Sequence, residues 1–455
     1  MNVLMVVPEL APFFKYSRLG LGENLRSQIF HLPESVVPIM PQYEGVQLPV
    51  CRHLEPLPGL GLEVCETLFP ASERRALMLR PVGGAFAPFV DATAPREQIV
   101  LFNRGVAAYV QRHPEWDVVH AHHWPCGLVP LLLRNLERPV PTLFTFYDLE
   151  EQPRLFADDL GDIELNPALR ERVQRLTPFN LTSLGIRFAR LLSTTSRRYA
   201  EEVRTEKLGH GLERLFVRRE ERMFGVMNGV RYGEWNPAKD VFLAHHYSDP
   251  EGKKLAKRDL QRELELPESD VPLVFYGGRL NKRYGCDLFL EALPELAEMP
   301  LQIVVYGTGD DEYLLRLEAL RGKCPNVRVR LGYDEAFLHR LVAGADMHLL
   351  PSFEQPGGTN HLVSLRYGVV PVARRTGGYV DAIHDQSDRA RHKVNGFLFG
   401  SYYANSFVQT VQEALDVYAA PDLWREYVQA AMDAEWTWKE NARAYENLYR
   451  KLVPE

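Results

Sequence analysis

Short apolar runs alternate with stretches of helical periodicity along most of this chain. The first such unit has an apolar run at residues 2–7, a loop with glycines and basic residues at 9–22, a helical pattern at 23–31 and a second apolar run at 35–40. A strand, a helix and a second strand in this order form a βαβ unit, in which the two strands are parallel. The pattern therefore predicts a parallel sheet near the start of the chain.

The rest of the first half continues this alternation less regularly. Residues 50–95 are rich in glycine and proline and only weakly periodic, which favours loops and short strands. Apolar runs at 117–120 and 142–146 predict two further strands, and a helix is expected to begin near Gly127, between them. These elements extend the α/β pattern through the first half.

A second α/β series follows a break in the pattern at residues 235–248, where NPAKD and HHYSDP interrupt it. A charged amphipathic helix, KKLAKRDLQRELEL, opens this series. Five apolar runs then alternate with helical patterns. The predicted strands are 273–276, 302–306, 328–331, 347–350 and 369–373. Such alternation predicts a doubly wound parallel sheet, whose ligands bind at the carboxyl ends of the strands.

The chain of 455 residues is too long for one ordinary hydrophobic core. We expect an α/β protein with two Rossmann-like, doubly wound domains, at residues 1–238 and 239–432, that face each other across a ligand-binding cleft. A helical segment rich in tryptophan and tyrosine completes the chain at 433–455. Its aromatic residues are most simply explained by helix packing, with stacking on sugar rings as the alternative.

Composition narrows the classes of partner. The chain is 45% hydrophobic and 25% charged, as in ordinary globular proteins, and its net charge is −7. A negative chain has no overall basic field that attracts nucleic acid or anionic lipid, so neither is an expected partner. The apolar start lacks a basic region and is too short for a signal sequence, and no run approaches the length of a membrane span.

The cysteines point to a reducing compartment. They are odd in number, widely scattered and without a CxxC pair, which argues against a disulfide framework and against a zinc site. The five cysteines are Cys51, Cys65, Cys126, Cys286 and Cys324. Together with the missing signal sequence, this predicts a cytoplasmic protein.

The candidate chemistry lies where predicted strands end. In PSFEQPGGTNHL, Gly357, Gly358 and Thr359 precede a helix, and backbone N–H groups at a helix N-terminus suit a phosphate. Arg279, directly after the strand VFYGG, could clamp a diphosphate with two hydrogen bonds. A plain turn and a surface arginine are the alternatives for these features.

Two other clusters have simpler explanations. The histidines of HAHHW, residues 120–124, lie together, but no carboxylate at matching spacing completes a site, so no metal is predicted. Three arginine-rich segments, RERVQR (170–175), RFARLL (187–192) and RREER (218–222), have helical spacing. They are most simply solvated helix faces or ion-pair networks.

The order of short motifs along the chain is more specific than any one of them. The motifs run nearly from end to end: PELAPFFK (8–15), MPQY (40–43), DVVHAH (117–122), SRRYAEEV (196–203), LGHGLE (208–213), MNGVRYGEWNPAKD (227–240), GRLNKRYGCDLFLEAL (278–293), YGTGD (306–310), LGYDEAFLHRLVAGADMHLLPS (331–352), LRYGVVPVARRTGG (365–378) and NGFLF (395–399). With these segments in this order, the chain resembles the bacterial glycogen and starch synthases, which are retaining glycosyltransferases of the two-domain GT-B fold.

The resemblance implies ADP-glucose in the interdomain cleft, a C-terminal helix that crosses back to the first domain, an α-glucan acceptor and no resident cofactor. The nucleotide-sugar positions it implies are Lys15, Arg18, Gly20, Asn228, Arg279, Tyr333, Gly357, Gly358, Thr359 and Asn360. The implied glucan positions are Glu9, His122 and Trp124, and the implied catalytic positions are Arg279, Tyr284, Glu354, Gln355 and Tyr147.

The same comparison shows substitutions at the reactive positions of the second half. In the family's R-L-x-x-Q-K-G, the arginine is retained as Arg279, but the lysine position holds Tyr284. The family's F-E-P-C-G-L-T is replaced, and an ungapped alignment puts Gln355, not Glu354, at the glutamate position. Neutral groups there stabilise a departing diphosphate and a positive sugar less than charged groups would.

The first half departs from the family as well. The family's lysine and two glycines correspond to residues 15–18, where Lys15 is retained and Ser17-Arg18 replaces the glycines. In F-T-I-H-N, whose histidine lies by the transferred glucose, the histidine position holds Tyr147. NGID has become NGVR, which reverses a charge at Arg231.

These substitutions predict a glycogen-synthase-like protein that is catalytically impaired, and that binds a glucan or nucleotide or partners an active synthase or branching enzyme. One alternative is an active transferase with a changed donor or acceptor, with Lys15, Arg18 and Arg279 on the phosphates. Another is an ordinary synthase that moves glucose from ADP-glucose to an α-1,4-glucan with retention. In that case Arg283 compensates for the lost lysine, and Glu354 replaces the glutamate after a one-residue shift of the loop.

Overall fold

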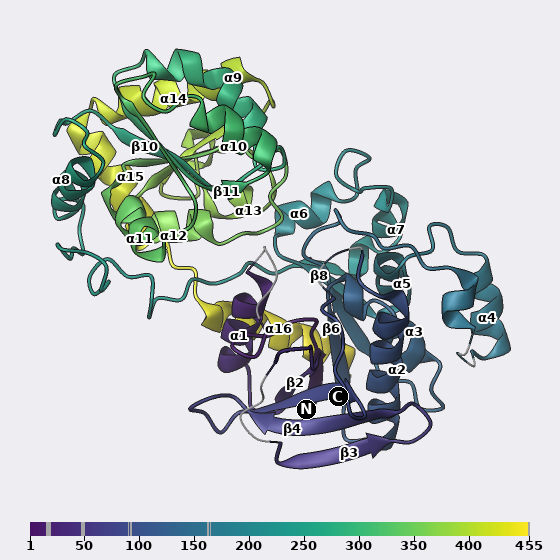
Figure 1. Ribbon diagram of the computed structural model, residues 1–455. Helices are drawn as coiled ribbons and strands as arrows, with labels where there is room; N and C mark the ends of the chain where they lie inside the picture. Colours follow the sequence, from purple (N-terminus) through teal and green to yellow (C-terminus); the bar gives the residue numbers. More distant parts are fainter. Residues whose placement is uncertain are drawn as a thin grey trace. The chain divides into compact units, whose positions relative to one another are not determined.

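The computed structural model describes residues 1–14, 20–46, 51–89, 91, 93–161, 163 and 165–453. These residues form two compact units (Figure 1). The first unit comprises Met1–Val226 and the chain from Trp438 onward, and the second comprises Met227–Thr437. The boundary thus falls earlier than the predicted residue 238, and the final helix joins the first unit from Trp438 rather than from residue 433.

Hydrogen bonds explain why the segment after Val226 belongs to the second unit. The Val230 N–H donates to the Trp436 carbonyl at 2.8 Å, and the Asn228 amide donates to the Gly357 carbonyl at 2.9 Å. Farther along, the buried Asp240 carboxylate lies 2.7 Å from His339 Nδ1. The NPAKD sequence is therefore part of the second unit, not a linker between the two.

The first unit is built on a nine-stranded sheet over the described residues, in the order β3-β4-β5-β2-β1-β6-β7-β8-β9. The strands are β1 (Val3–Val6), β2 (Val36–Pro41), β3 (His53–Leu57), β4 (Leu62–Leu68), β5 (Arg75–Pro81), β6 (Val118–His122), β7 (Thr142–Thr145), β8 (Leu191–Thr194) and β9 (Met223–Gly225). Only the β3–β4 and β4–β5 pairs are antiparallel among these. Parallel order from β2 to β9 follows from the helical crossovers between strands.

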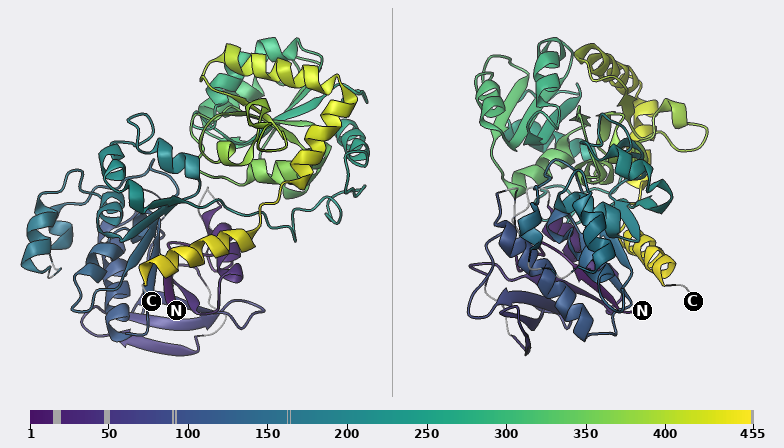
Figure 2. Two further views of the ribbon diagram at one scale, coloured as in Figure 1. Left: turned by 180° about the vertical axis from the view of Figure 1, so that it is seen from behind. Right: turned by 90° about the vertical axis from the view of Figure 1, so that its right-hand side faces the viewer.

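Helices cover both faces of this sheet. Helices α1 and α16 lie together on one face, and α2, α3 and α5 lie on the other (Figures 1 and 2). The α-helices are α1 (Leu21–His31), α2 (Arg96–Arg112), α3 (Val129–Arg134), α4 (Pro167–Gln174), α5 (Leu181–Phe188), α6 (Arg197–Glu202), α7 (Glu213–Val217) and α16 (Trp438–Leu452). Short 3₁₀ turns are η1 (Trp124–Cys126), η2 (Ala157–Leu160) and η3 (Glu220–Arg222).

The second unit has a six-stranded, fully parallel sheet in the order β12-β11-β10-β13-β14-β15. Its strands are β10 (Leu273–Leu280), β11 (Gln302–Gly309), β12 (Val327–Leu331), β13 (Met347–Leu350), β14 (Val370–Arg374) and β15 (Phe397–Phe399). Its helices are α8 (Lys253–Glu263), α9 (Cys286–Ala297), α10 (Asp311–Glu318), α11 (Glu335–Gly344), α12 (Asn360–Arg366), α13 (Gly377–Ala382), the 3₁₀ turn η4 (Gln386–Asp388), α14 (Ala404–Tyr418) and α15 (Pro421–Asp433).

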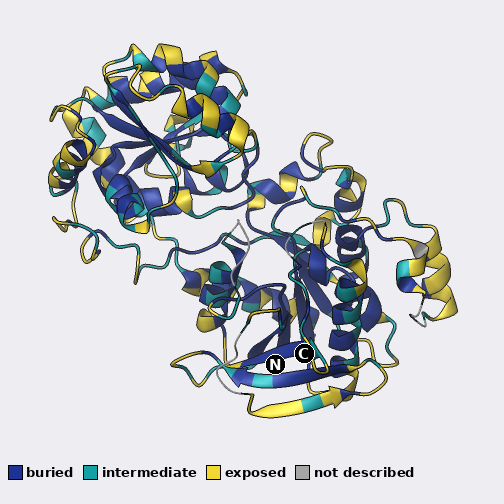
Figure 3. Cartoon of the chain, viewed as in Figure 1, coloured by how far each residue is buried: buried dark blue, intermediate teal, exposed yellow. Residues whose placement is uncertain are grey.

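Each unit has its own hydrophobic core, which confirms the predicted α/β class with two parallel-sheet domains. The central strands of both sheets are buried, whereas the edge strand β3 is largely exposed (Figure 3). In α16, Trp438, Tyr445 and Tyr449 are buried, and the last two pack in the core of the first unit, so these aromatic side chains do not present rings to a sugar. No helix of the described residues is long and apolar enough to cross a membrane.

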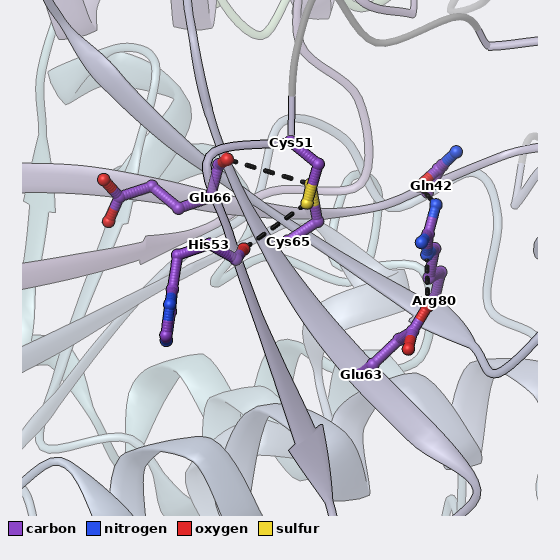
Figure 4. The surroundings of a disulfide bond; sticks show 7 residues. All are labelled: Gln42, Cys51, His53, Glu63, Cys65, Glu66 and Arg80. Atoms are coloured by element: carbon purple, nitrogen blue, oxygen red, sulfur yellow. Dashed lines mark hydrogen bonds and ion pairs between the residues drawn. A yellow bond between two sulfur atoms is a disulfide. The ribbon is translucent and has the colours of Figure 1, made fainter.

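The prediction on cysteines was wrong in part. Cys51 and Cys65 form a disulfide, with their Cα atoms 5.6 Å apart (Figure 4). Antiparallel pairing of β3 with β4 brings these residues together, and the weak periodicity of residues 50–95 gave no sign of that hairpin. Beside the disulfide, Arg80 links Glu63, at 2.7 Å, to the Gln42 amide, at 3.3 Å.

Candidate functional site

The candidate donor site of the second unit lies at the carboxyl ends of β10 and β13. These two strands are neighbours in the parallel sheet, with Tyr276 opposite Leu349, so the segments that follow them meet at one edge. Arg279 lies at the end of β10 itself, Tyr284 lies in the segment after it, and the loop 351–359 follows β13. We call this loop the donor loop.

Two glycines fix the path of the donor loop by close backbone contact. At Gly285, which has a φ of +80° and begins α9, a Cβ atom would lie 2.1 Å from the Pro351 carbonyl oxygen. At Gly377, with a φ of +44°, a Cβ atom would lie 1.7 Å from the Gln355 carbonyl oxygen. The Gly378 N–H donates to this same oxygen at 3.0 Å. Any other residue at either position would displace the loop.

Gln355, at the position of the family's glutamate, has its amide engaged within the protein. It is buried, its Nε2 donates to the Tyr379 hydroxyl at 3.2 Å, and its Oε1 accepts from the Gly358 N–H at 3.2 Å. The Tyr379 hydroxyl also lies 3.0 Å from the Ser352 hydroxyl, and burial raises the pKa of Tyr379 to about 12. The amide therefore closes the glycine turn against the core.

Glu354 and Arg283 form a buried ion pair. The guanidinium Nη2 lies 3.3 Å from the Glu354 Oε1, and the two side chains are 11% and 4% exposed. The backbone strengthens this connection, because the Phe353 N–H donates to the Arg283 carbonyl at 2.8 Å. The pair thus joins the segment after β10 to the donor loop.

Tyr284 occupies the position of the family's lysine with a neutral side chain. Its N–H donates to the Asn281 side chain at 3.1 Å, and its carbonyl accepts from the Tyr276 hydroxyl at 3.3 Å. The ring is half-buried, with the Arg283 guanidinium 6.0 Å from its centre. The turn is therefore retained, while the charge moves one residue along the chain.

The remaining predicted donor residues are distributed around this edge. Arg279 is half-buried on β10, and no ion pair joins it to another residue in the described part of the chain. Asn228 supports the loop through its bond to the Gly357 carbonyl. Thr359 and Asn360 form the start of α12, and Tyr333 is 72% exposed after β12.

A second candidate site lies at the carboxyl ends of β6 and β7 in the first unit. His122 Nδ1 lies 2.8 Å from the Tyr147 hydroxyl, and the two rings stack at 6.1 Å. His120, packed 3.8 Å from His122, contacts the Tyr449 hydroxyl at 2.9 Å and the Thr145 hydroxyl at 2.7 Å. The histidines are thus members of a buried polar layer beneath the strand ends.

Burial keeps this layer neutral. It lowers the pKa of His122 to about 3, with the nearby His123 adding to the effect, and it raises the pKa of Tyr147 well above its usual range. The His122 Nε2 is buried without a hydrogen-bond partner among the described residues, so it is available to a hydroxyl group. No cluster of three or more potential metal ligands occurs in the described ranges.

The other residues predicted in the first unit are less suited to direct contact. Trp124 is buried in the core, so its ring cannot stack on a glucan at the surface. Glu9 is also buried, and its carboxylate accepts from the Gly22 N–H at 2.6 Å in the first turn of α1. Gly20 precedes this helix with a φ of +66°. Lys15 and Arg18 lie outside the described residues.

Sequence reasoning gave no role to two residues that hold the donor loop. Arg374 donates through Nε to the Ser352 carbonyl at 2.6 Å and through Nη2 to the Phe353 carbonyl. Tyr379 contacts both Ser352 and Gln355. The motif ARRTGGY, residues 373–379, was a signal for both, because it follows β14 at the same edge of the sheet.

A separate open cleft of about 740 Å³ lies in the first unit between α6, β9 and α16. Its lining includes Arg197, Arg204 and Lys451, and the Lys451 ammonium lies 4.6 Å from the centre of the Phe224 ring. None of the predicted site residues that the structure describes lines it. We therefore take the strand ends, not this cleft, as the candidate functional site.

Two doubly wound α/β domains with a glycine loop and an arginine at the strand ends define a glycosyltransferase of the GT-B fold. A family model described as the starch synthase catalytic domain matches residues 2–218, and one described as glycosyl transferases group 1 matches residues 257–431. The glycogen synthase of Syntrophotalea carbinolica is 32% identical over all of this chain and 99% of its own length. That of Myxococcus xanthus is 31% identical over the full length of both. The chain belongs to the glycogen synthase family.

Solved structures agree with this assignment. The catalytic domain of starch synthase IV from Arabidopsis thaliana, bound to ADP and acarbose, has a TM-score of 0.81 and 25% identity, and 99% of each chain is covered. The sucrose-phosphate synthase of Thermosynechococcus elongatus shares the fold, with a TM-score of 0.60, 17% identity, and 99% of this chain and 98% of its own covered.

Proposed function

We propose that this protein binds a nucleotide sugar and an α-glucan but transfers glucose poorly on its own, and that it acts as a binding protein or as the partner of an active synthase or branching enzyme. One observation carries the proposal. At the donor loop, Tyr284 and Gln355 are neutral, while the neighbouring charges of Arg283 and Glu354 are already paired with each other.

The transfer reaction makes two electrostatic demands. Cations must stabilise the diphosphate as it leaves, and polar groups must stabilise the positive charge that develops on the sugar. Removal of one preorganised donor of this kind typically costs about 10²–10³ in rate. The changes at Tyr284, Gln355 and Tyr147 together are expected to cost about 10⁴ or more, because such effects combine without strict additivity.

Because Arg283 is paired with Glu354, it compensates poorly for the lysine that Tyr284 replaces. To reach a diphosphate, the guanidinium would have to break its buried ion pair with Glu354, which typically costs about 3–5 kcal/mol. That cost is similar to the roughly 3–4 kcal/mol that one transition-state donor contributes. The free-energy cost of breaking the ion pair nearly cancels the transition-state stabilisation that Arg283 could provide, so a positive charge at position 283 does not replace the missing lysine.

Binding is less affected than turnover. Arg279 is at the strand end and has no competing ion pair with any residue that the structure describes. Asn228 supports the donor loop, and Tyr333 is exposed at the same edge of the sheet. The Arabidopsis relative bound to ADP and acarbose supports nucleotide and carbohydrate as the ligand classes. No resident cofactor is part of the proposal.

The test is an assay of the purified chain with glycogen and either ADP-glucose or UDP-glucose, in which nucleotide release and glucan growth are measured. We expect slow turnover that rises about 10²-fold or more in the variant Tyr284→Lys/Gln355→Glu, because both charges return. The matched control Tyr403→Lys/Gln412→Glu makes the same charge changes at exposed positions of the same unit.

Turnover by the unmodified chain within tenfold of an ordinary synthase would overturn the proposal. Rapid turnover with UDP-glucose alone would instead support an active transferase with a changed donor. Calorimetric titration with ADP and with a maltooligosaccharide separates binding from transfer, and the proposal requires that at least one of these ligands binds.

A further inference from the structure

Three arginine-rich segments that are far apart in the sequence converge on one region of the first unit. They are the end of α4, the end of α5 and the segment after α7, and the end of α3 adds one more arginine. These helices lie on the same side of the sheet in Figure 1. We call the group the arginine face: Arg134, Arg172, Arg187, Arg218, Arg219 and Arg222.

The positive charges of this face act on one another. Burial, with the charges of Arg222, Arg134 and Arg172 adding to the effect, lowers the pKa of Arg219 to about 10. Burial likewise lowers the pKa of Arg187, with contributions from Arg218 and Arg172. No carboxylate acts in the opposite direction on either group.

Within the described part of the chain, no member of the arginine face forms an ion pair. Two acidic residues of the same segments pair with arginines outside the face, Glu171 with Arg175 at 2.5 Å and Glu220 with Arg204. Other arginines of this unit have carboxylate partners, such as Arg80 with Glu63 at 2.7 Å. What distinguishes the arginine face is that several such guanidinium groups lie together, close enough to act on one another and joined by the contact of Arg219 with the Arg187 carbonyl.

Neutral groups hold part of the face in place. Arg219 donates to the Arg187 carbonyl at 3.3 Å and to the Ala189 carbonyl, at the end of α5. Arg187 donates to the Thr177 carbonyl at 2.8 Å, and the Arg172 guanidinium lies 4.9 Å from the centre of the Phe188 ring. These contacts orient the side chains but leave their charges uncompensated. Held this way, the guanidinium groups lose little further freedom when an anion binds.

We propose that the arginine face binds a carboxylate-rich segment of a partner protein. The planar guanidinium fork matches a carboxylate with two parallel hydrogen bonds, and arginine is enriched in protein interfaces. Val217, which is 53% exposed beside Arg218, adds an apolar contact of the kind a polypeptide supplies. The chain as a whole carries −7, so its long-range field opposes nucleic acid and anionic membranes, whereas a short segment meets only the local positive charge.

The test uses a fluorescein-labelled deca-glutamate peptide, with fluorescence anisotropy measured at physiological ionic strength. A deca-glutamine peptide, a single-stranded DNA decamer and inorganic polyphosphate serve as comparison probes. The face variant neutralises four arginines: Arg134→Gln, Arg172→Gln, Arg218→Gln and Arg222→Gln. The matched control removes the same charge from ion-paired arginines of the same unit: Arg75→Gln, Arg80→Gln, Arg112→Gln and Arg198→Gln.

We expect deca-glutamate to bind, the face variant to bind it about tenfold or more weakly, and the control variant to remain within about twofold, because charge close to the peptide dominates at this ionic strength. If the fourfold variant fails to fold, the double variant Arg218→Gln/Arg222→Gln, which changes only exposed side chains, is measured instead. We expect it also to bind deca-glutamate more weakly than the unmodified chain does. Absence of binding by the unmodified chain, equal loss in face and control variants, or tighter binding of DNA or polyphosphate than of deca-glutamate would each overturn the inference. None of these outcomes depends on whether the protein transfers glucose.

Discussion

The charged side chains at the donor loop of the second unit and on the arginine face of the first differ in whether they have ion-pair partners. At the donor loop, Arg283 and Glu354 neutralise each other in the interior, and the Gln355 amide is used by Tyr379 and Gly358. On the arginine face, six guanidinium groups share one region, and none has a carboxylate partner among the residues that the structure describes.

Whether the charged groups of a candidate site are already paired says more about its function than the presence of a motif does. A group that is already paired must give up its partner before it can serve a ligand, and a buried partner left behind is costly. A group without a partner gains from a ligand directly. The strand-end position makes the donor loop a candidate site, and the charges of Arg283 and Glu354 beside it are already paired with each other.

The largest predicted effect concerns buried histidines at the strand ends and beneath the donor loop. Burial lowers the pKa of His122 in the first unit and of His348 and His361 in the second to about 3. In the unfolded chain these groups titrate near pH 6.5, so below that pH the unfolded state binds protons that the folded state does not. The free energy of unfolding should therefore fall as the pH decreases, by about 2 kcal/mol per histidine at pH 5, and so by about 4 kcal/mol for the two histidines of the second unit.

Chemical denaturation at pH 7, 6 and 5 measures this loss. His122→Gln should flatten the pH dependence of the first unit, and His348→Gln should flatten that of the second. Both side chains have a hydrogen-bond partner that glutamine can keep, the Tyr147 hydroxyl and the Ser364 hydroxyl respectively. A stability that stays constant from pH 7 to 5 would contradict the assignment of neutral, buried imidazoles.

Much of the fold follows from patterns that the sequence displays openly. The apolar runs behind β1, β2, β6, β7 and the central strands of the second unit are buried on both faces, so they appear as continuous hydrophobic segments. Three strands were missed because they are short or overlap another signal. β9 and β15 have three residues each, and β8 begins inside the arginine-rich RFARLL.

The sequence predicts where the candidate site residues lie on the sheet, but not how they pair. Because β10 and β13 are parallel neighbours, Arg279 and the donor loop lie at one edge of the sheet, where ligands are expected to bind. The Arg283–Glu354 pair joins residues 71 positions apart, and no local pattern reveals such a partner. Sequence alone therefore allowed Arg283 to compensate for Tyr284, an alternative that the buried pair now weakens.

The second predicted effect tests the ion pair between Arg283 and Glu354. Glu354→Gln removes one charge of the buried pair and leaves Arg283 without its carboxylate, so we expect the second unit to lose about 3 kcal/mol of stability in urea denaturation. The double variant Arg283→Met/Glu354→Gln should recover most of this loss, because it leaves no buried charge unpaired. If Glu354→Gln proves neutral, the pair does not hold Arg283, and the argument against compensation fails.

The smallest predicted effect tests the arginine face of the first unit. Arg218→Gln/Arg222→Gln removes repulsion within the arginine face and should raise the stability of the first unit by about 0.5 kcal/mol or less, since both side chains are exposed. Arg75→Gln/Arg112→Gln removes exposed arginines that pair with Glu66 at 3.4 Å and with Glu55 at 2.9 Å, so the sign should reverse. Urea denaturation at low and moderate salt measures both, and salt should shrink each difference toward zero because it screens attraction and repulsion alike. Two changes of equal charge on one unit would then shift stability in opposite directions. If both variants change the stability of the first unit in the same direction, net charge rather than local ion pairing determines the stability effect at this surface. That result would argue against the arginine face as a binding site.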